Sequence, residues 1–430
     1  MIRLVRGFKD ILPADTALWQ HVEGVVRELL EDFGFAELRI PVVEQTELFA
    51  RSIGAGTDIV EKEMYTFTDR GGTSLSLRPE ATASVVRAYV EHRLYAKDPV
   101  RKLYTIGPMF RRERPQRGRY RQFHQVNAEI FGLHDPRADA ELILLLMTFM
   151  GRLELSSVTL HINSLGCPEC RPRFKDALKS FLTGRSEKFC SDCLRRKDEN
   201  PLRLFDCKVP ECKEAMQEAP SILDDLCDEC STHFDDVKKS LDGFQIPYQI
   251  NNRLVRGLDY YTRTTFEVIA ESLGAQDAVA GGGRYDGLVK ALGGPNEPGI
   301  GFAVGVDRLM ELLAGRAQDF EKRPHVFVAA IGQPAQDMAF KWVQEFRLQG
   351  IRAEMDLENR SLKSQMRRAD KLGASYVLIV GDRELDEGVV AFRNMATKEQ
   401  EQIGLQEVVE TAVERIKASA VSVADHDYES

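Results

Sequence analysis

The residue pattern of the chain changes at Pro324, and this change constrains the fold more than any other feature of the sequence. After Pro324, strand-like runs alternate with helix-like stretches; the runs are HVFVAAI, IRAEMDL, YVLIVGD and VVAFRN, and the stretches are 334–349, 361–372 and 400–418. Such alternation is typical of an α/β domain with a largely parallel sheet. We therefore predict a separate α/β domain over residues 323–420, with a disordered tail at 421–430.

The pattern before Pro324 is different and predicts an α+β domain over residues 1–322. Helical spacing marks residues 16–33, 80–96 and 137–152, whereas residues 101–111 and 121–131 look like two strands of one hairpin. The residues MYTFTD and TSLSLR flank the turn sequence Asp69-Arg70-Gly71-Gly72, which predicts a further hairpin. We expect an antiparallel sheet flanked by helices.

An arginine-rich run, FRRERPQRGRYRQFHQ, joins the two strands of the first hairpin. Six arginines lie within eleven residues, although the formal net charge of the chain is -9. An arginine at the end of a strand can direct two N–H donors at a phosphate or carboxylate, and Arg111 has this position. The loop residues Arg112 to Arg119 could reach a second anion. The alternative is a solvated basic loop, and the overall acidity argues against a nonspecific nucleic-acid binder.

Four further motifs combine charged, aromatic and glycine residues. They are RPEAT at 78–82, LVRGLDYY at 254–261, GGGRYDGL at 281–288 and GFAVGVDRL at 301–309. In the first, Glu80 and Thr82 could bind an ammonium group or simply cap a helix. The glycine triplet would let the backbone lie against a flat ligand. The last motif predicts a strand that leads into a helix near Val304, with Arg308 in its first turn.

All eight cysteines lie in one segment, about 166–235, and they form four close pairs. The pairs are Cys167 and Cys170, Cys190 and Cys193, Cys207 and Cys212, and Cys227 and Cys230. Two such pairs can complete a tetrahedral four-thiolate site, so eight thiols allow up to two structural zinc ions. An iron–sulfur cluster or plain reduced thiols are the alternatives. The sequence does not indicate which pairs combine.

The chain contains no targeting or membrane-spanning pattern. No run of about 18 apolar residues is present, and the N-terminal MIRLVRGFKDILP lacks the apolar core of a secretory signal. We expect a cytoplasmic protein with no membrane partner.

Taken in this order, the motifs closely resemble the histidyl-tRNA synthetase family of class II aminoacyl-tRNA synthetases. FRRER resembles the second motif of the class and GFAVGVDRL the third, whereas LVRGLDYY and GGGRYDGL resemble the two histidine-specific motifs. The unit that ends at Pro41 resembles the first motif, which implies a homodimer. Ala81 departs from the glycine that the family usually has in RPEAT.

The resemblance implies the reaction and its phosphate-binding residues. L-Histidine would be activated with ATP and Mg²⁺ and then transferred to the 3′-terminal adenosine of the histidine tRNA. It assigns Arg111 to the α-phosphate, Arg308 to the γ-phosphate and Arg119 to ATP. Arg256 would approach the α-phosphate from the amino-acid side, so that Arg256 and Arg111 are the expected catalytic residues.

The resemblance also implies how histidine is recognised. Glu129 and Tyr261 would read the imidazole ring, and Tyr260 would lie beside them. Glu80 and Thr82 would bind the α-ammonium group and Gln125 the carboxylate. Tyr285 would close the pocket. Buried polar groups of this kind discriminate strongly against analogues that lack the partner atoms, so no editing domain is needed.

The domain from residue 323 onward would bind the anticodon. Lys363, Arg367 and Lys371 recur every four residues on one expected helix, which predicts a phosphate-binding stripe or a solvated face. Arg114 and Arg117 would contact the acceptor end of the tRNA. Two other functions remain open: the synthetase-like regulatory subunit of ATP phosphoribosyltransferase, which does not aminoacylate, and a cysteine-rich RNA-binding or redox-sensing module.

Overall fold

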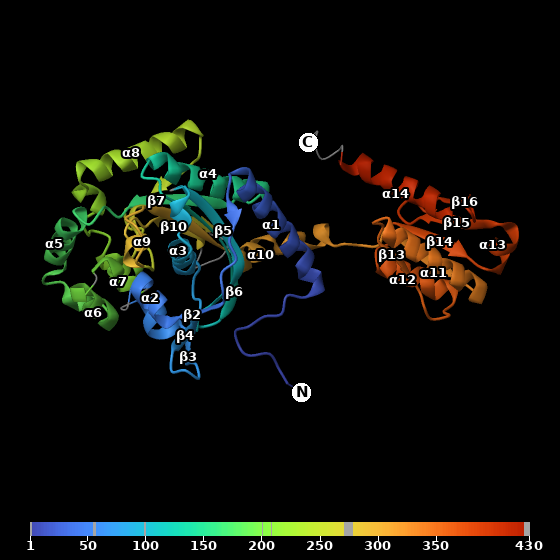
Figure 1. Ribbon diagram of the computed structural model, residues 1–430, viewed down its shortest axis with the longest axis horizontal. Coiled ribbons are helices and arrows are strands. Elements are labelled where there is room, and N and C mark those ends of the chain that lie inside the picture. The colour runs from blue at the N-terminus through green and yellow to red at the C-terminus, as the bar shows by residue number, and fades with distance from the viewer. Residues whose placement is uncertain are drawn as a thin grey trace. The chain divides into compact units, whose positions relative to one another are not determined.

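The computed structural model describes residues 2–54, 57–98, 100–199, 201–207, 209–270 and 278–424. The chain separates into two compact units, Met1–Phe320 and Glu321–Ser430 (Figure 1). This boundary lies two residues before the expected one. None of the described helices combines the length and apolar character that crossing a membrane requires.

Within the described residues, an eight-stranded sheet forms the centre of the first unit. Its strands, in spatial order, are β1 (Ala36–Glu37), β5 (Arg101–Phe110), β6 (Gln122–Phe131), β11 (Gly299–Gly305), β10 (Ala278–Arg284), β9 (Thr262–Ala270), β7 (Val158–Ser164) and β8 (Gln249–Ile250). Every pair from β5 to β7 is antiparallel, and only the short edge strands β1 and β8 pair in parallel. The expected antiparallel sheet and its central hairpin are confirmed.

Helices cover one face of this sheet with a large hydrophobic core. They are α1 (Pro13–Asp32), α4 (Pro136–Arg152), α8 (Asp228–Gly243) and α10 (Val306–Leu313). Alternate side chains of β6, namely Val126, Ala128 and Ile130, point into this core. Because successive residues of a strand face opposite sides, Gln125, Asn127 and Glu129 lie on the other face.

The other face is covered in part by α3 (Thr82–Glu91) and α9 (Leu288–Ala291). Tyr89, Phe131 and Tyr285 pack there in a smaller core. The helix expected at 80–96 is therefore shorter, because Arg93 adopts a left-handed conformation (φ 49°) before a turn of 3-10 helix at Leu94–Ala96.

The remaining elements of the first unit surround this sheet. The described residues include α2 (Thr46–Ile53), the sheet of β2 (Val43–Gln45), β4 (Ser74–Leu77) and β3 (Tyr65–Thr68), and the cysteine-bearing segment with α5 (Cys170–Leu182), α6 (Ser191–Glu199) and α7 (Pro210–Ala215). The β3–β4 hairpin turns at Asp69, whose side chain accepts hydrogen bonds from the backbone N–H groups of Gly71 and Thr73. The predicted hairpin is confirmed.

The second unit contains a five-stranded sheet within its described residues. The strand order is β13 (Ala353–Met355), β12 (Val326–Ala330), β14 (Tyr376–Val380), β15 (Val389–Asn394) and β16 (Gln400–Gly404). The helices are α11 (Gln333–Leu348), α12 (Leu362–Lys371), α13 (Asp382–Glu387) and α14 (Val408–Ala424). The first three strands in this order pair in parallel and the last two pairings are antiparallel, so the sheet is mixed rather than largely parallel.

The prediction for the C-terminal residues is wrong at two points. Residues 400–404 form strand β16 instead of the start of a helix, because a turn with Lys398 in the left-handed region (φ 65°) folds them back onto β15. Helix α14 continues to Ala424, so residues 421–424 are helical. The rest of the predicted tail, 425–430, lies outside the described residues.

Candidate active site

A cavity opens on the face of the large sheet opposite the main core. The strands β6, β9, β10 and β11 contribute its floor, and the arginine-rich loop and the 256–261 stretch contribute its walls. Polar side chains of β6 meet small residues of the neighbouring strands here, among them Gly281, Ala303 and Gly305. The alternation of polar and apolar residues along β6 therefore creates a polar recess instead of a second core.

The structure brings most of the predicted site residues to this cavity. Those that line it are Glu80, Thr82, Arg111, Arg119, Gln125, Arg256, Tyr260, Tyr261 and Arg308. Several lining residues were not predicted: Glu113, Tyr120, Phe123, His124, Asn127, Glu267 and Asp307. Asn127 could have been found from the alternation along β6, whereas Glu267 reaches the cavity from β9, a strand that contacts β6 only through two others.

Four arginines face this one cavity. Arg111 donates a hydrogen bond through Nε to the carbonyl oxygen of Pro79 at 2.8 Å, and burial lowers its pKa. Arg119 is ion-paired with Glu113, and burial together with the nearby Arg308 lowers its pKa to about 10. Arg308 also donates to the carbonyl oxygen of Ala278. Cations that destabilise one another in a buried space favour a polyanionic ligand.

Arg256, the fourth cation, lies against Gly281, the first glycine of the triplet. Its guanidinium is 2.5 Å from Oε1 of Glu267, and the Glu267 carboxylate helps to raise its pKa against the opposing effect of burial. A Cβ atom on Gly281 would overlap this guanidinium. The group that lies against this glycine is therefore the Arg256 side chain and not the flat ligand that the sequence suggested.

Glu129 is the centre of a buried hydrogen-bonded network. Thr82 donates its hydroxyl to Oε1 at 2.7 Å, and Tyr285 donates its hydroxyl to Oε2 at 2.5 Å. Burial raises the pKa of Glu129 to about 8. Glu129 and Tyr285 adjoin the lining residue Thr82 through this network, and the closing of the pocket by Tyr285 stays a prediction.

Glu80 caps helix α3. Its carboxylate accepts hydrogen bonds from the backbone N–H groups of Thr82 at 2.7 Å and Ala83 at 2.9 Å, which satisfies two free donors at the helix start. Its burial raises its pKa. Glu80 therefore caps the helix, which was one of its two expected roles. It also lines the cavity and remains available to a cationic ligand.

Four buried polar atoms of the lining residues have no hydrogen-bond partner within the described residues. They are Nδ1 of His124, Oε1 of Gln125, Oδ1 of Asn127 and Nε of Arg256. Buried polar groups are almost always hydrogen-bonded in folded proteins. Two amide oxygens and one guanidinium N–H without partners, in residues that line one cavity, fit a small ligand that carries both amine and carboxylate or phosphate groups.

Gly301 on β11 leaves the space that Glu129 occupies. A Cβ atom at this position would overlap the Glu129 carboxylate. We predict that Gly301→Ala displaces Glu129 and raises the KM for the amino-acid ligand at least 10-fold, since a shifted carboxylate no longer meets its partners. The KM from a steady-state activation assay checks this.

Gly315→Ala is the matched control, because an added Cβ meets no atom within 4 Å there. We expect a wild-type KM for this variant. Equal effects of the two substitutions would contradict the packing role of Gly301.

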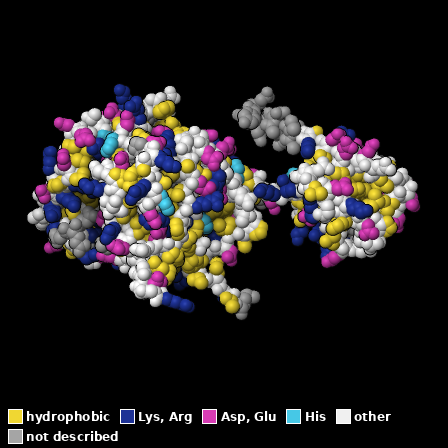
Figure 2. Space-filling model, viewed as in Figure 1, with side chains coloured by type: hydrophobic (Ala, Val, Ile, Leu, Met, Phe, Trp, Pro, Cys, Tyr) yellow, Lys and Arg dark blue, Asp and Glu magenta, His cyan; other side chains and the backbone are white. Residues whose placement is uncertain are grey.

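The basic residues predicted to meet RNA lie outside this cavity. Arg117 is exposed and pairs with Glu311 at 2.6 Å, and Arg114 also lies in the loop between β5 and β6. Lys363, Arg367 and Lys371 are all exposed on α12, opposite the buried Gln365 and Ala369. On the face of the first unit seen in Figure 2, basic and acidic side chains are interspersed. Acidic side chains also accompany the four arginines in the cavity, namely Glu80, Glu113, Glu267 and Asp307.

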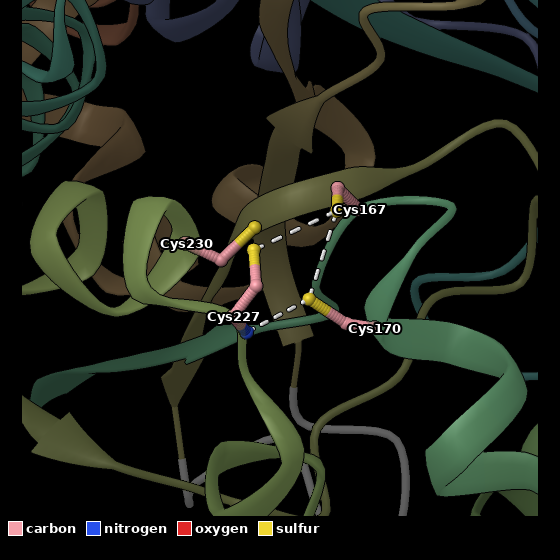
Figure 3. A group of neighbouring side chains, drawn as sticks. All are labelled: Cys167, Cys170, Cys227 and Cys230. Atoms are coloured by element: carbon pink, nitrogen blue, oxygen red, sulfur yellow. Dashed lines mark hydrogen bonds between the residues drawn. The ribbon is translucent and has the colours of Figure 1, made fainter.

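The eight cysteines form two groups of four in the described part of the chain. One group contains Cys167, Cys170, Cys227 and Cys230, and the other contains Cys190, Cys193, Cys207 and Cys212. The four sulfur atoms of the first group point toward one another (Figure 3). The first and last cysteine pairs along the sequence therefore form one group, and the two middle pairs form the other.

Comparisons with known proteins agree with this geometry. Residues 7–309 match the family described as Histidyl-tRNA synthetase, and residues 325–415 match the Anticodon binding domain. The chain is 60% identical over 405 residues to the histidine–tRNA ligase of Desulfatibacillum aliphaticivorans, which covers 94% of this chain and 97% of the relative. It is 54% identical over 403 residues to the histidine–tRNA ligase of Geobacter metallireducens, a match that covers 94% of this chain and 97% of the relative.

A solved structure gives the same result for the fold. The apo histidyl-tRNA synthetase of S. aureus superposes with a TM-score of 0.81 at 38% identity, covering 96% of this chain and 99% of the other. The expected fold, a class II catalytic domain followed by an anticodon-binding domain, is confirmed. The chain belongs to the histidyl-tRNA synthetase family.

Proposed function

We propose that this chain is a histidine–tRNA ligase that activates L-histidine with ATP and transfers it to the 3′-terminal adenosine of a histidine tRNA. The observation that carries this proposal is one cavity that combines four arginines with Thr82, whose hydroxyl donates to the buried carboxylate of Glu129 directly behind it. The arginines suit a triphosphate, and the carboxylate suits a ring N–H donor.

The activation step needs positioning and charge stabilisation rather than a nucleophile from the protein. An oxygen of the histidine carboxylate forms a bond to the α-phosphorus, and the bond from this phosphorus to the bridging oxygen of the β-phosphate breaks, so that diphosphate leaves. Negative charge increases on the α-phosphate oxygens in the transition state. Arg111 and Arg256 lie in the cavity as preorganised donors for this charge.

The other two arginines hold the rest of the nucleotide. Arg119 and Arg308 bind the outer phosphates, since both guanidinium groups line the same cavity. The carboxylates of Glu113, Glu267 and Asp307 also line it, and carboxylate oxygens are ligands that Mg²⁺ prefers. Mg²⁺ bound there with ATP would neutralise phosphate charge.

Histidine recognition uses the buried network and its neighbours. Glu129 and Tyr261 read the two ring nitrogens, and Tyr260 packs against Tyr261 with ring centroids 4.7 Å apart. Glu80 and Thr82 bind the α-ammonium group. Gln125, whose Oε1 lacks a protein partner among the described residues, contacts the amino-acid backbone. Tyr285 positions Glu129.

The second unit is proposed to bind the anticodon, with Lys363 and Arg367 as phosphate contacts, while Arg114 and Arg117 contact the acceptor end. We also propose a homodimer. Val42 and Val43, which follow the first class motif, are 37% and 38% exposed, which suits an apolar contact with a second copy. Light scattering that gives the mass of one chain would rule out the dimer.

The alternative is that the chain is a regulatory subunit of ATP phosphoribosyltransferase. The anticodon-binding match over residues 325–415 and the complete set of arginines in the cavity favour the ligase. A cysteine-rich RNA-binding or redox module leaves this cavity unexplained.

Histidine-dependent exchange of labelled diphosphate into ATP tests the proposal. We expect exchange with histidine and none with other amino acids. A folded protein that shows no exchange with histidine would exclude the ligase and favour the regulatory subunit. Charging of histidine tRNA then tests the transfer step.

A further inference from the structure

Two cysteine clusters lie in the segment from the end of β7 to the first turn of α8, and the segment itself has little core to stabilise it. The base cluster is Cys167, Cys170, Cys227 and Cys230, at the two ends of the segment; the tip cluster is Cys190, Cys193, Cys207 and Cys212. The apolar residues buried between them include Phe174, Leu178, Leu182, Leu204 and Ile222. A segment of about 60 residues with a core this small usually needs cross-links or a metal.

The sulfur atoms have the separations of a metal site. Cys167 Sγ lies 3.6 Å from Cys170 Sγ and 3.9 Å from Cys227 Sγ, and in the tip cluster Cys190 Sγ lies 3.8 Å from Cys207 Sγ. Four sulfurs at about 2.3 Å from one tetrahedral zinc ion are about 3.8 Å apart, whereas a disulfide brings sulfurs to about 2.05 Å. All eight cysteines are unbridged.

The backbone around each cluster supports thiolate ligands. Cys227 N–H donates to Cys170 Sγ at 3.2 Å, and Cys190 N–H donates to Cys212 Sγ at 3.2 Å. Hydrogen bonds of this kind orient a metal ligand and favour its charged form. Gly166 adopts φ +61°, and a Cβ there would lie 2.7 Å from Cys170 Cβ, so this turn is shaped to bring Cys167 and Cys170 together.

Both clusters are connected to the loop that carries Arg256, Tyr260 and Tyr261. Arg171, the residue after Cys170, donates to the carbonyl oxygen of Tyr261. Arg203, four residues before Cys207, donates to Asp259 at 2.7 Å.

Two further contacts join the insertion to the catalytic unit. Arg253 donates to the carbonyl oxygens of Pro220 at 3.0 Å and Gln217 at 2.8 Å, and both acceptors lie in the inserted segment. Arg196 of α6 pairs with Asp58 at 2.7 Å. The segment therefore contacts the proposed histidine-binding loop at several points, and its rigidity determines how firmly that loop is held.

We propose that the two clusters are two structural Zn²⁺ sites with four thiolate ligands each, outer pair with outer pair and inner pair with inner pair, and that they hold the loop 254–261 against the catalytic cavity. The base ion closes the segment where it leaves and rejoins the catalytic unit. The tip ion fixes the short helices that present Arg196 and Arg203. The connection to histidine binding rests on the proposed function, whereas the metal sites do not.

Metal content of double variants tests the pairing. Wild-type protein should contain two Zn²⁺ per chain, one for each cluster. Cys167→Ser/Cys227→Ser removes two ligands of one cluster and should leave one ion. Cys167→Ser/Cys190→Ser removes one ligand from each cluster and should leave close to none. If neighbouring pairs in the sequence combined instead, the two results would be exchanged and the proposed pairing would be wrong.

Wild-type protein provides a test that does not depend on the folding of variants. Titration with a mercurial reagent should release two Zn²⁺ as eight thiols react. Protein purified with Co²⁺ should show the absorption of tetrahedral thiolate coordination. Iron with acid-labile sulfide, or eight reactive thiols without metal, would overturn the proposal.

Arg203→Met tests the connection to the loop. We expect an unchanged zinc content and a KM for histidine raised about 3- to 10-fold, because Asp259 loses the Arg203 guanidinium next to the tyrosines. Arg173→Met is the control, since this side chain is 71% exposed and pairs with Asp225 inside the segment. An unchanged KM in Arg203→Met would overturn the connection and leave the metal sites standing. If the proposed function itself is wrong, wild type will also lack histidine-dependent exchange.

Discussion

Replacing Arg256 by alanine is expected to lower the rate of histidine activation about 100- to 1000-fold, the usual effect of removing one preorganised charge-stabilising donor. Its guanidinium is fixed on two sides before substrate arrives, by the Glu267 carboxylate at 2.5 Å and by the backbone of Gly281. Its Nε is buried and has no partner among the described residues. A donor in this state interacts most strongly with charge that appears during the reaction.

The KM for histidine should change only a few-fold in Arg256→Ala, because the imidazole ring is read elsewhere. Pre-steady-state formation of histidyl-adenylate measures both quantities. Arg256→Lys should recover part of the rate, since it keeps the charge but loses the forked donor. Arg39→Ala is the matched control, with a side chain that is 84% exposed and should leave the rate unchanged. A near-normal rate in Arg256→Ala would remove this residue from the catalytic set.

The sequence predicts the parts of this site that depend on local pattern. The hairpin strand predicted at 121–131 is present, and its alternation places Gln125 and Glu129 on the face opposite Val126 and Ile130. Strand β5 ends at Phe110, so Arg111 is the first residue after the strand. Both features arise within one hairpin, where neighbouring residues determine the geometry.

Features that depend on the register of distant strands could not be predicted. Glu267 meets Arg256 because β9 pairs with β10, and Glu129 fits under β11 because Gly301 is its partner in the ladder. No local pattern encodes these pairings. The pairing of the cysteines is equally nonlocal, since it depends on where α8 returns to the end of β7, while each Cys pair by itself requires only a turn.

The C-terminal unit shows that a helix-like residue pattern does not by itself predict a helix. Residues 400–404 are as polar as a helix surface, yet they form the edge strand β16, with only Ile403 buried. Pairing with β15 outweighs the weak local preference. The helix expected at 400–418 therefore begins only at Val408, because the turn before it closes a hairpin.

Glu129→Gln should raise the KM for histidine about 100-fold with a smaller change in kcat, because a carboxylate that accepts a ring N–H is replaced by a neutral amide. The amide keeps the shape of the side chain, so the hydroxyl groups of Thr82 and Tyr285 retain a partner. Equilibrium binding of histidine to the variant measures the loss. Glu91→Gln, at a side chain that is 60% exposed, is the control and should bind histidine normally.

The same substitution should change how stability depends on pH. The pKa of Glu129 rises from 4.5 to about 8 on burial, so between these values the folded protein holds a proton that the unfolded chain has released. Stability from this group is therefore present below pH 4.5 and is lost as pH rises toward 8. Glutamine does not titrate, so the melting temperature of Glu129→Gln relative to wild type should increase from pH 5 to pH 8. A constant difference across that range would show that burial does not raise the pKa of Glu129 in the folded protein.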